Sequence, residues 1–205
     1  SLAIIGGAKI SSKINVIYSL INLVDKVIIG GGMAYTFIKA MGGSIGSSLI
    51  EEEQLEEAKK IIYKSKENGV ELLLPVDSVN SKSFSNSVDS TTNIFKIPKN
   101  NMGLDIGPMS IELFQKNILE AKKIIWNGPM GVFEFSNFSN GTMLVGQAIA
   151  KSTENGAYSL VGGGDSIAAI KKYNLNKKVS YISTGGGAML EFLEGKELPA
   201  LSALL

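Results

Sequence analysis

The sequence predicts a doubly wound α/β domain whose mainly parallel sheet carries helices on both faces, as a Rossmann-like three-layer sandwich. Short aliphatic and β-branched segments alternate with helical patterns along most of the chain. These segments are hydrophobic throughout, which is typical of parallel strands buried on both faces. Glycine pairs or triplets follow several of them, and no Pro- or Gly-rich linker divides the sequence. We therefore expect one domain over residues 1–205.

The expected elements follow one another in the order strand, helix, strand. The predicted strands are residues 2–5, 26–29, 71–74, 123–126, 158–161 and 179–182, and the predicted helices are residues 12–24, 32–41, 51–68, 108–121, 137–153, 166–173 and 188–193. The clearest helix is the one at 51–68, where Leu55, Ala58 and Ile61 share one side, acidic residues fill the first turns and Gly69 marks the end.

Residues 76–92 break the alternation, because they include six serines, two asparagines and two aspartates. We interpret this segment as extended chain and loop over the sheet edge, followed by a possible strand at residues 93–97. Its low hydrophobicity makes it the segment that we expect to be most mobile.

The composition excludes several classes of function. The formal net charge is +1, from 20 basic and 19 acidic residues without a long run of either sign, so we expect small-molecule partners, no nucleic acid and no membrane. The absence of cysteine and histidine excludes disulfides, a Ser-His-Asp triad and most zinc sites. No apolar stretch approaches the roughly 18 residues that span a bilayer. A cytoplasmic monomer is the simplest expectation.

All 20 basic residues are lysine. Without the planar two-point grip of arginine, an anion would be held by lysine, by backbone N–H groups or by a metal ion. Coding bias explains the same composition equally well.

Strand-glycine-helix junctions occur five times, at residues 5–9, 29–33, 126–131, 161–165 and 183–188. Right-handed crossovers would bring all five to the edge formed by the carboxyl ends of the strands. Glycine permits close backbone approach, and a helix start offers free N–H groups and a partial positive charge, which together suit phosphate. Tight packing of helix on strand explains any single junction, but the repetition favours a phosphate site.

Lys9 and Lys13 support the same interpretation. They are four residues apart, so they would lie near one another at the start of the helix predicted at 12–24. Two cations at a helix N-terminus are unfavourable without a ligand, and an anion bound between them would reverse this effect. The alternative is two solvated surface lysines.

Four further polar residues are candidates for the same edge. Asp165 follows a glycine triplet and suits Mg²⁺ beside phosphate oxygens, although it would serve equally as a helix cap. Ser166 would belong to the same cluster. Asn127 and Glu134 flank a glycine turn and would hydrogen-bond a ribose, with a solvated loop acid as the alternative for Glu134.

Three common sets of nucleotide-binding motifs are missing. The chain has no Gly-x-x-x-x-Gly-Lys-Ser/Thr phosphate loop and no protein-kinase motifs. It also has no Gly-x-Gly-x-x-Gly, because Tyr35, Ile167 and Leu190 stand where the last glycine would fall. A dinucleotide-dependent dehydrogenase therefore lacks its fingerprint.

Seven ordered segments nevertheless resemble the phosphoglycerate kinases in sequence and spacing. They are GGAK at residues 6–9 with Lys13, GGGMAYTF at 30–37, LPVD at 74–77, MGLDIGP at 102–108, WNGPMGVFE at 126–134, GGGDS at 162–166 and STGGGA at 183–188. The resemblance covers essentially the whole chain and is to the C-terminal, nucleotide-binding domain of that family.

The resemblance implies transfer of the acyl phosphate of 1,3-bisphosphoglycerate to MgADP, which gives 3-phosphoglycerate and MgATP in glycolysis. It implies ATP or ADP and Mg²⁺ as cofactors, with Asp165 at the magnesium. Residues implied to act at the transferring phosphoryl group are Lys9, Lys13, Gly163 and Gly186. Those implied to bind the nucleotide are Gly7, Ala8, Lys9, Lys13, Gly31, Gly32, Leu104, Asn127, Pro129, Glu134, Gly164, Asp165, Ser166, Gly185, Gly186 and Gly187.

The chain departs from the family in one respect. Family members carry an N-terminal domain of similar size whose arginines and a histidine bind 3-phosphoglycerate, and this chain has neither residue type. We therefore expect it to be the nucleotide half, which binds nucleotide but is inactive alone. The alternatives are a non-catalytic nucleotide-binding module and a Rossmann-type NAD-dependent oxidoreductase.

Overall fold

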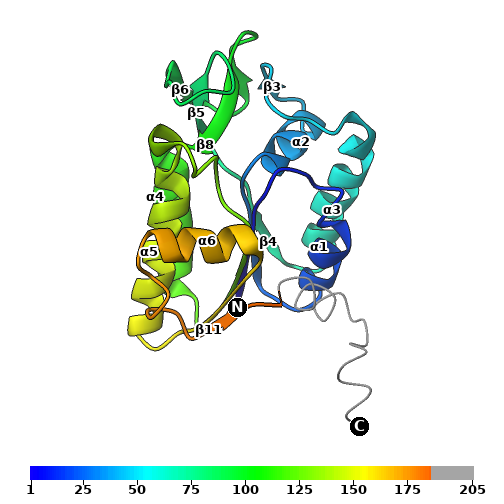
Figure 1. The fold of residues 1–205 in the computed structure, drawn as a ribbon. Helices are drawn as coiled ribbons and strands as arrows, with labels where there is room; N and C mark the ends of the chain where they lie inside the picture. The colour runs from blue at the N-terminus through cyan, green and yellow to red at the C-terminus, as the bar shows by residue number, and fades with distance from the viewer. Residues whose placement is uncertain (186–205) are drawn as a thin grey trace.

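A six-stranded sheet forms the centre of the protein in the computed structural model, which describes residues 1–185 (Figure 1). Its strands are β1 (Leu2–Ile5), β2 (Lys26–Ile29), β4 (Glu71–Leu73), β9 (Lys123–Asn127), β10 (Tyr158–Gly162) and β11 (Tyr181–Ser183), in the order β11-β10-β9-β1-β2-β4. Every neighbouring pair is parallel. All four residues of the central β1 are buried, which explains its uninterrupted hydrophobicity.

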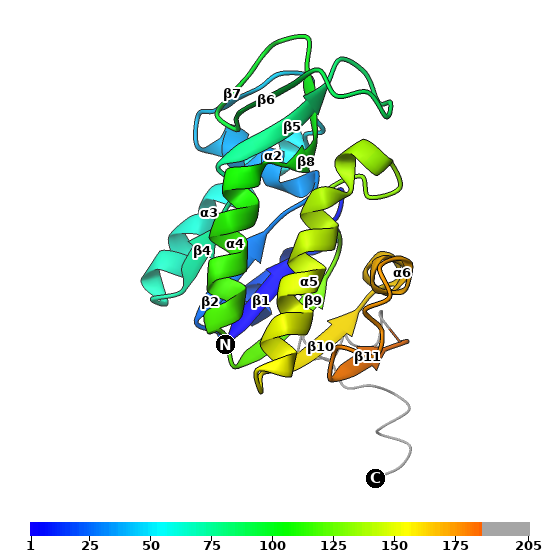
Figure 2. The ribbon, with the colours of Figure 1, turned by 90° about the vertical axis from the view of Figure 1, so that its left-hand side faces the viewer.

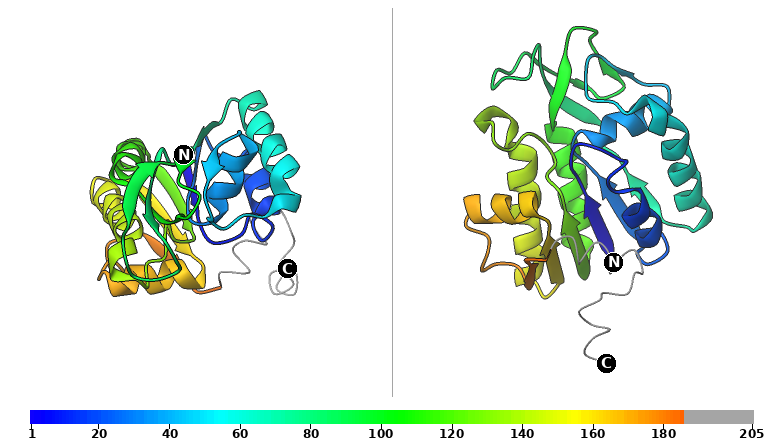
Figure 3. Two further views of the ribbon diagram at one scale, coloured as in Figure 1. Left: turned by 90° about the horizontal axis from the view of Figure 1, so that it is seen from above. Right: turned by 45° about the vertical axis from the view of Figure 1, so that its right-hand side comes forward.

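Within residues 1–185, three helices cover each face of this sheet. One face carries α1 (Ile14–Leu20), α2 (Met33–Ala40) and α3 (Leu55–Glu67), and the other carries α4 (Pro108–Glu120), α5 (Asn140–Glu154) and α6 (Gly164–Lys172). Viewed from above, the two groups lie on opposite sides of the molecule (Figure 3). Alternate residues of β1 supply the two cores, with Ala3 and Ile5 on the side of α1 to α3 and Ile4 on the other. The predicted doubly wound α/β fold is therefore confirmed.

The helix boundaries differ from the predicted ones by a few residues. The helix predicted at 12–24 is shortened to α1, and the one predicted at 51–68 begins as a short 3-10 helix, η1 (Glu52–Gln54), before α3. A second 3-10 helix, η2 (Ser136–Phe138), precedes α5. The predicted helix at 188–193 lies outside the described residues. Among those described, no helix has the length and apolarity needed to cross a bilayer.

Residues 76–92, which we expected to be extended chain and loop, contain both, but their extended parts pair as strands that the sequence did not single out. These residues supply β5 (Asp77–Ser81) and the start of β6 (Ser90–Asn93), which join β8 (Met102–Ile106) in a three-stranded antiparallel sheet. The possible strand at 93–97 is divided between β6 and β7 (Lys96–Ile97), and β7 pairs with β3 (Ser44–Ile45). The three-stranded sheet of β5, β6 and β8, called the small sheet below, lies beyond the carboxyl ends of the six-stranded sheet (Figure 2).

Hydrogen bonds of its buried polar side chains stabilise the polar strand β5, although Asn80 Oδ1 is buried without a partner among the described residues. Ser78 and Asn80 are fully buried, and the Asn80 amide donates to Thr92 Oγ1 across the ladder at 2.9 Å. The Asp77 carboxylate accepts hydrogen bonds from the backbone N–H groups of Met109 and Ser110 at 3.0 and 2.8 Å. Because these are the first free N–H groups of α4, Asp77 both caps that helix and ties the small sheet to it.

Candidate functional site

Two adjoining cavities open at the carboxyl edge of the large sheet. The larger, about 440 Å³, lies between this edge and the small sheet, and the smaller, about 310 Å³, lies over the starts of α1 and α6. Gly7, Ala8, Pro129 and Asp165 line both, so the two cavities form one continuous cleft. This edge is where open parallel sheets bind their ligands.

Three glycine-rich loops, after β1, β2 and β9, are bound directly to one another at this edge. The N–H of Gly7 donates to Pro129 O at 3.1 Å, and the N–H of Gly31 donates to Met130 O at 3.1 Å. The N–H of Met33, at the start of α2, donates to Gly7 O at 3.1 Å. Predicted site residues from three separate segments are thereby brought into contact.

Glycine is required where two of these loops cross. A Cβ on Gly128, whose φ is +101°, would lie 2.1 Å from Gly6 O. A Cβ on Gly6 would in turn lie 2.1 Å from Pro129 O. Backbone meets backbone here, so no side chain fits without separating the loops, and the cleft depends on these glycines.

The smaller cavity gathers most of the predicted charged and polar residues. Its lining includes Lys9, Lys13, Asn127, Gly163, Gly164, Asp165 and Ser166, beside Gly7 and Ala8. Lys13 directly precedes α1, and its ammonium donates to Asn127 Oδ1. Burial lowers the pKa of Lys13, and the nearby charge of Asp165 offsets part of that effect. An anion placed here would favour the charged form of Lys13 further.

The start of α6 is joined to the loop after β9 at the base of this cavity. The fully buried Ser166 hydroxyl accepts a hydrogen bond from the Gly128 N–H at 2.6 Å. The Asn127 side chain, whose oxygen faces Lys13, donates through Nδ2 to Gly162 O at 3.0 Å. Ser166 and Asn127 are therefore part of the framework that holds the cavity, and Asn127 lies beside Lys13 and not beside Glu134.

The larger cavity is mainly apolar and includes residues that the sequence did not reveal. Its lining contains the predicted Gly31, Gly32, Leu104 and Glu134 together with Tyr35, Ser47, Leu49, Phe84, Met102, Met130 and Val132. Glu134 is exposed at its rim, and Leu104 is 7% exposed. No sequence signal singled out Leu49, because it follows an irregular segment whose position depends on the tertiary fold.

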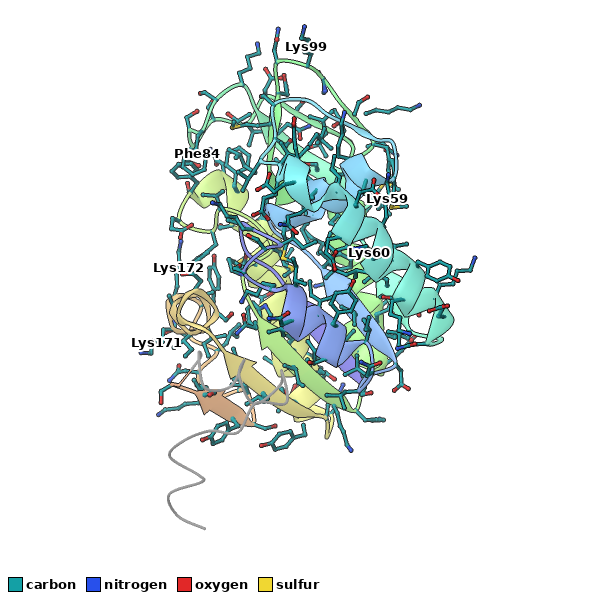
Figure 4. The ribbon with its side chains drawn as sticks, turned by 90° about the vertical axis from the view of Figure 1, so that its right-hand side faces the viewer. Lys59, Lys60, Phe84, Lys99, Lys171 and Lys172 are labelled. Carbon is teal, nitrogen blue, oxygen red and sulfur yellow. The ribbon has the colours of Figure 1, made fainter. Side chains whose placement is uncertain are left out.

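Phe84 was missed because it lies in the polar segment at residues 76–92, which we interpreted as extended chain and loop. It is 65% exposed and packs against Phe135, with ring centroids 5.1 Å apart. Asn86 holds the same segment to η2, since its Nδ2 donates to Ser136 Oγ at 2.9 Å and its Oδ1 accepts from Asn137 N–H at 2.9 Å. Figure 4 shows Phe84 at the edge of the molecule, where it forms part of the outer wall of the larger cavity.

A buried carboxylate supports the wall formed by the loop after β9. Asp105, in β8, is 2% exposed, and its Oδ2 accepts from the Gly141 N–H at the start of α5 at 2.8 Å. A Cβ on Gly131 would lie 2.2 Å from Asp105 Oδ1, so this loop rests directly on the carboxylate. Burial raises the pKa of Asp105 to about 7, although the N–H groups of Gly141 and Ile106 counteract the shift.

We expect this group to make stability depend on pH. An unfolded aspartate titrates near about 3.9, so the folded chain holds the extra proton between that pH and about 7. The Asp105 contribution is therefore complete below pH ~4 and is lost as pH rises to ~7, by at most about 4 kcal/mol. Urea unfolding at pH 5 and pH 8 should show a smaller difference for Asp105→Asn than for the unchanged chain. An identical difference in both proteins would contradict the assignment.

The residues present are compatible with Mg²⁺ only if a ligand completes its coordination. Among residues 1–185, no cluster of three acidic side chains is placed to hold a metal ion. Asp165 is the acidic residue in the described lining of the smaller cavity, and Mg²⁺ typically takes one or two carboxylates plus phosphate oxygens. Gly185 follows β11 at the same sheet edge and lines neither cavity as described. Gly186 and Gly187 lie outside the described residues.

The fold and its cleft define a doubly wound α/β protein with its candidate site at the carboxyl ends of the parallel strands, where proteins of this class bind their ligands. The sequence profile of the phosphoglycerate kinase family matches residues 1–196. The chain belongs to the phosphoglycerate kinase family.

Individual relatives agree with this assignment. The chain is 54% identical over 205 residues to a phosphoglycerate kinase of Porphyromonas gingivalis, with 98% of this chain and 49% of that protein covered. Its structure is similar to the phosphoglycerate kinase of Coxiella burnetii, with a TM-score of 0.94 and 47% identity over 99% of this chain and 52% of that one. The corresponding enzyme of Pyrococcus horikoshii gives a TM-score of 0.83 at 31% identity, over 100% of this chain and 51% of that one. The chain thus spans about half the length of the relatives it matches.

Proposed function

We propose that this chain is the nucleotide-binding half of a phosphoglycerate kinase and that it binds MgADP and MgATP. The observation that carries the proposal is the continuity of an apolar cavity with one lined by lysines, glycines and an aspartate. An adenine nucleotide likewise has an apolar part and a charged part. The faces of its flat base are mostly apolar, and its phosphates are anionic.

The apolar walls of the larger cavity receive the base and sugar in this proposal. Leu49, Leu104 and Val132 contact the base, and the exposed carboxylate of Glu134 accepts hydrogen bonds from ribose hydroxyls. Close approach of the nucleotide to the backbone is possible because Gly31 and Gly32 carry no side chain at this wall.

Lys9 and Lys13 hold the phosphates in the smaller cavity. The Lys13 ammonium is positioned by Asn127 and loses hydration on burial, so its attraction to a phosphate is stronger than that of a solvated lysine. Mg²⁺, when bound, would neutralise phosphate charge beside Asp165. The N–H groups at the start of α6 add a partial positive charge at the same place.

The complete reaction is part of the proposal. A phosphoryl group passes from the acyl phosphate of 1,3-bisphosphoglycerate to ADP, and positioning with charge stabilisation accounts for most of the catalysis. A second half, carrying the phosphoglycerate, has to close on this one. The chain alone is therefore expected to bind nucleotide without measurable turnover, and its cytoplasmic location and monomeric state stay predictions.

Calorimetric titration of the chain with ADP, with and without Mg²⁺, tests the proposal. We expect saturable binding of ADP that strengthens with Mg²⁺, because Asp165 and the phosphates share the ion. NAD serves as the matched control, since a dinucleotide-dependent oxidoreductase would prefer it. Absence of ADP binding, or preferential binding of NAD, would overturn the proposal, and robust ATP formation from 1,3-bisphosphoglycerate by the chain alone would refute its dependence on a second half.

A further inference from the structure

Glu51 is a buried carboxylate outside both cavities that contacts the loop carrying the two candidate phosphate-binding lysines. It is 7% exposed and directly precedes η1. Its Oε2 accepts from the backbone N–H of Ser11 at 3.1 Å, and its Oε1 accepts from the Ser11 hydroxyl at 2.5 Å. Ser11 lies between Lys9 and Lys13 in the loop from β1 to α1. Both carboxylate oxygens are thus committed to one residue of that loop.

The backbone of Glu51 is anchored to a buried residue of α2. The Glu51 N–H donates to Thr36 Oγ1 at 3.2 Å, and Thr36 is buried within α2. Helix α2 begins directly after Gly32, which lines the larger cavity. The Glu51–Ser11 contact therefore connects the Lys9–Lys13 loop to the element that forms a wall of the larger cavity.

The loop is bonded to other segments at its two ends, through Gly7 and the Lys13 ammonium, and residues 8–12 between them have few other restraints. Ile10 is fully buried in the core beside α1, whereas Ala8, Lys9 and Ser12 are exposed. The Ser12 hydroxyl donates within the loop, to Lys9 O at 2.8 Å. Two charge-assisted hydrogen bonds to a buried acceptor are strong restraints on such a segment.

Burial of a carboxylate is unfavourable unless hydrogen bonds compensate for lost hydration. A neutral side chain would serve simple packing at this position without that cost. A buried carboxylate bonded to one serine is explained if the position of Ser11, and with it the spacing of Lys9 and Lys13, matters for binding.

We propose that Glu51 is a positioning residue that acts through Ser11 to hold Lys9 and Lys13 in the geometry that binds the nucleotide phosphates. This inference rests on the proposed function, because it assigns the lysines to phosphate. The proposal predicts that a Glu51 variant loses affinity only for the phosphates of the ligand. Glu51 lines neither cavity, so its replacement leaves the apolar wall that receives the base unchanged.

Binding of ADP and of adenosine to Glu51→Gln tests the proposal. We expect ADP affinity to fall about tenfold, because one charge-assisted hydrogen bond is weakened, while adenosine affinity stays within about twofold of the unchanged chain. Ser11→Ala should give the same pattern, and Glu51→Gln added to Ser11→Ala should cause little further loss. The neighbouring Glu52→Gln, which has no contact with Ser11 among the described residues, is the control and should leave both affinities unchanged.

Hydrogen–deuterium exchange without nucleotide separates this inference from the proposed function. The peptide covering residues 8–13 should exchange faster in Glu51→Gln than in Glu52→Gln, because the Ser11 N–H loses its charged acceptor. Unchanged exchange would overturn the positioning role whether or not ADP binds. Faster exchange with an equal loss of ADP and adenosine affinity would also overturn it, because that result indicates a general structural effect. If exchange rises in Glu51→Gln but the unchanged chain binds no ADP, the positioning of the loop stands, whereas the proposed function and the phosphate role fail.

Discussion

Replacement of Lys13 by alanine in the proposed two-domain kinase is expected to lower its turnover by about 100- to 1000-fold, the usual effect of removing one preorganised donor from a transition state. The Lys13 ammonium is partly buried, is oriented by Asn127 and directly precedes α1. A preorganised ammonium stabilises the transition state, where charge develops during phosphoryl transfer, more than it stabilises bound ADP. The affinity for ADP should therefore change much less than kcat. Steady-state kinetics combined with ADP titration measures both effects.

The matched control is Lys99→Ala. Lys99 is exposed at the far tip of the molecule, beyond the small sheet, and its replacement removes the same charge without touching the cleft (Figure 4). Turnover of this variant should equal that of the unchanged protein. Turnover in Lys13→Ala equal to that of the control would remove the role assigned to Lys13.

Replacement of Gly128 by alanine is expected to destabilise the chain by about 2 to 5 kcal/mol, from backbone strain and overpacking together. The new Cβ would lie 2.1 Å from Gly6 O, and φ at this position is +101°. The loops after β1 and β9 would have to separate, so nucleotide binding should be lost along with stability. Urea unfolding and ADP titration of the same preparation check the two effects.

Gly69→Ala separates backbone strain from steric overlap. Gly69 follows α3 with φ +69°, and a Cβ there would meet no atom within 4 Å. This variant should lose only the cost of a positive φ, about 1 to 2 kcal/mol, and should bind ADP normally. Equal destabilisation in Gly69→Ala and Gly128→Ala would show that the crossing of the loops is not the cause.

The sequence was most informative where the chain is buried on both sides. The strands predicted at 2–5 and 26–29 coincide with β1 and β2, because a parallel strand beneath helices on both faces tolerates little polarity. Hydrophobicity did not reveal the strands β5 and β6. Their side chains are polar, and their stability depends on partners such as Ser110 that lie far away along the chain.

The residues of the candidate site also fall into two groups, those that the sequence reveals and those that only the structure reveals. Glycine turns and the Lys9–Lys13 pair are local patterns, so the amino-acid sequence alone reveals them. Phe84 and Glu51 have no local signature, because each reaches the cleft or its loop through contacts across the fold.

The sequence by itself thus determined the layered α/β fold, the family resemblance and the glycine and lysine candidates, because hydrophobic periodicity and turn chemistry act over a few neighbouring residues. Only the tertiary structure decided that the polar segment pairs as a sheet above the cleft, that Asn127 faces Lys13 and that Glu51 holds Ser11. These features depend on hydrogen bonds between distant segments, whose partners are specified by the arrangement of the whole chain and not by local sequence.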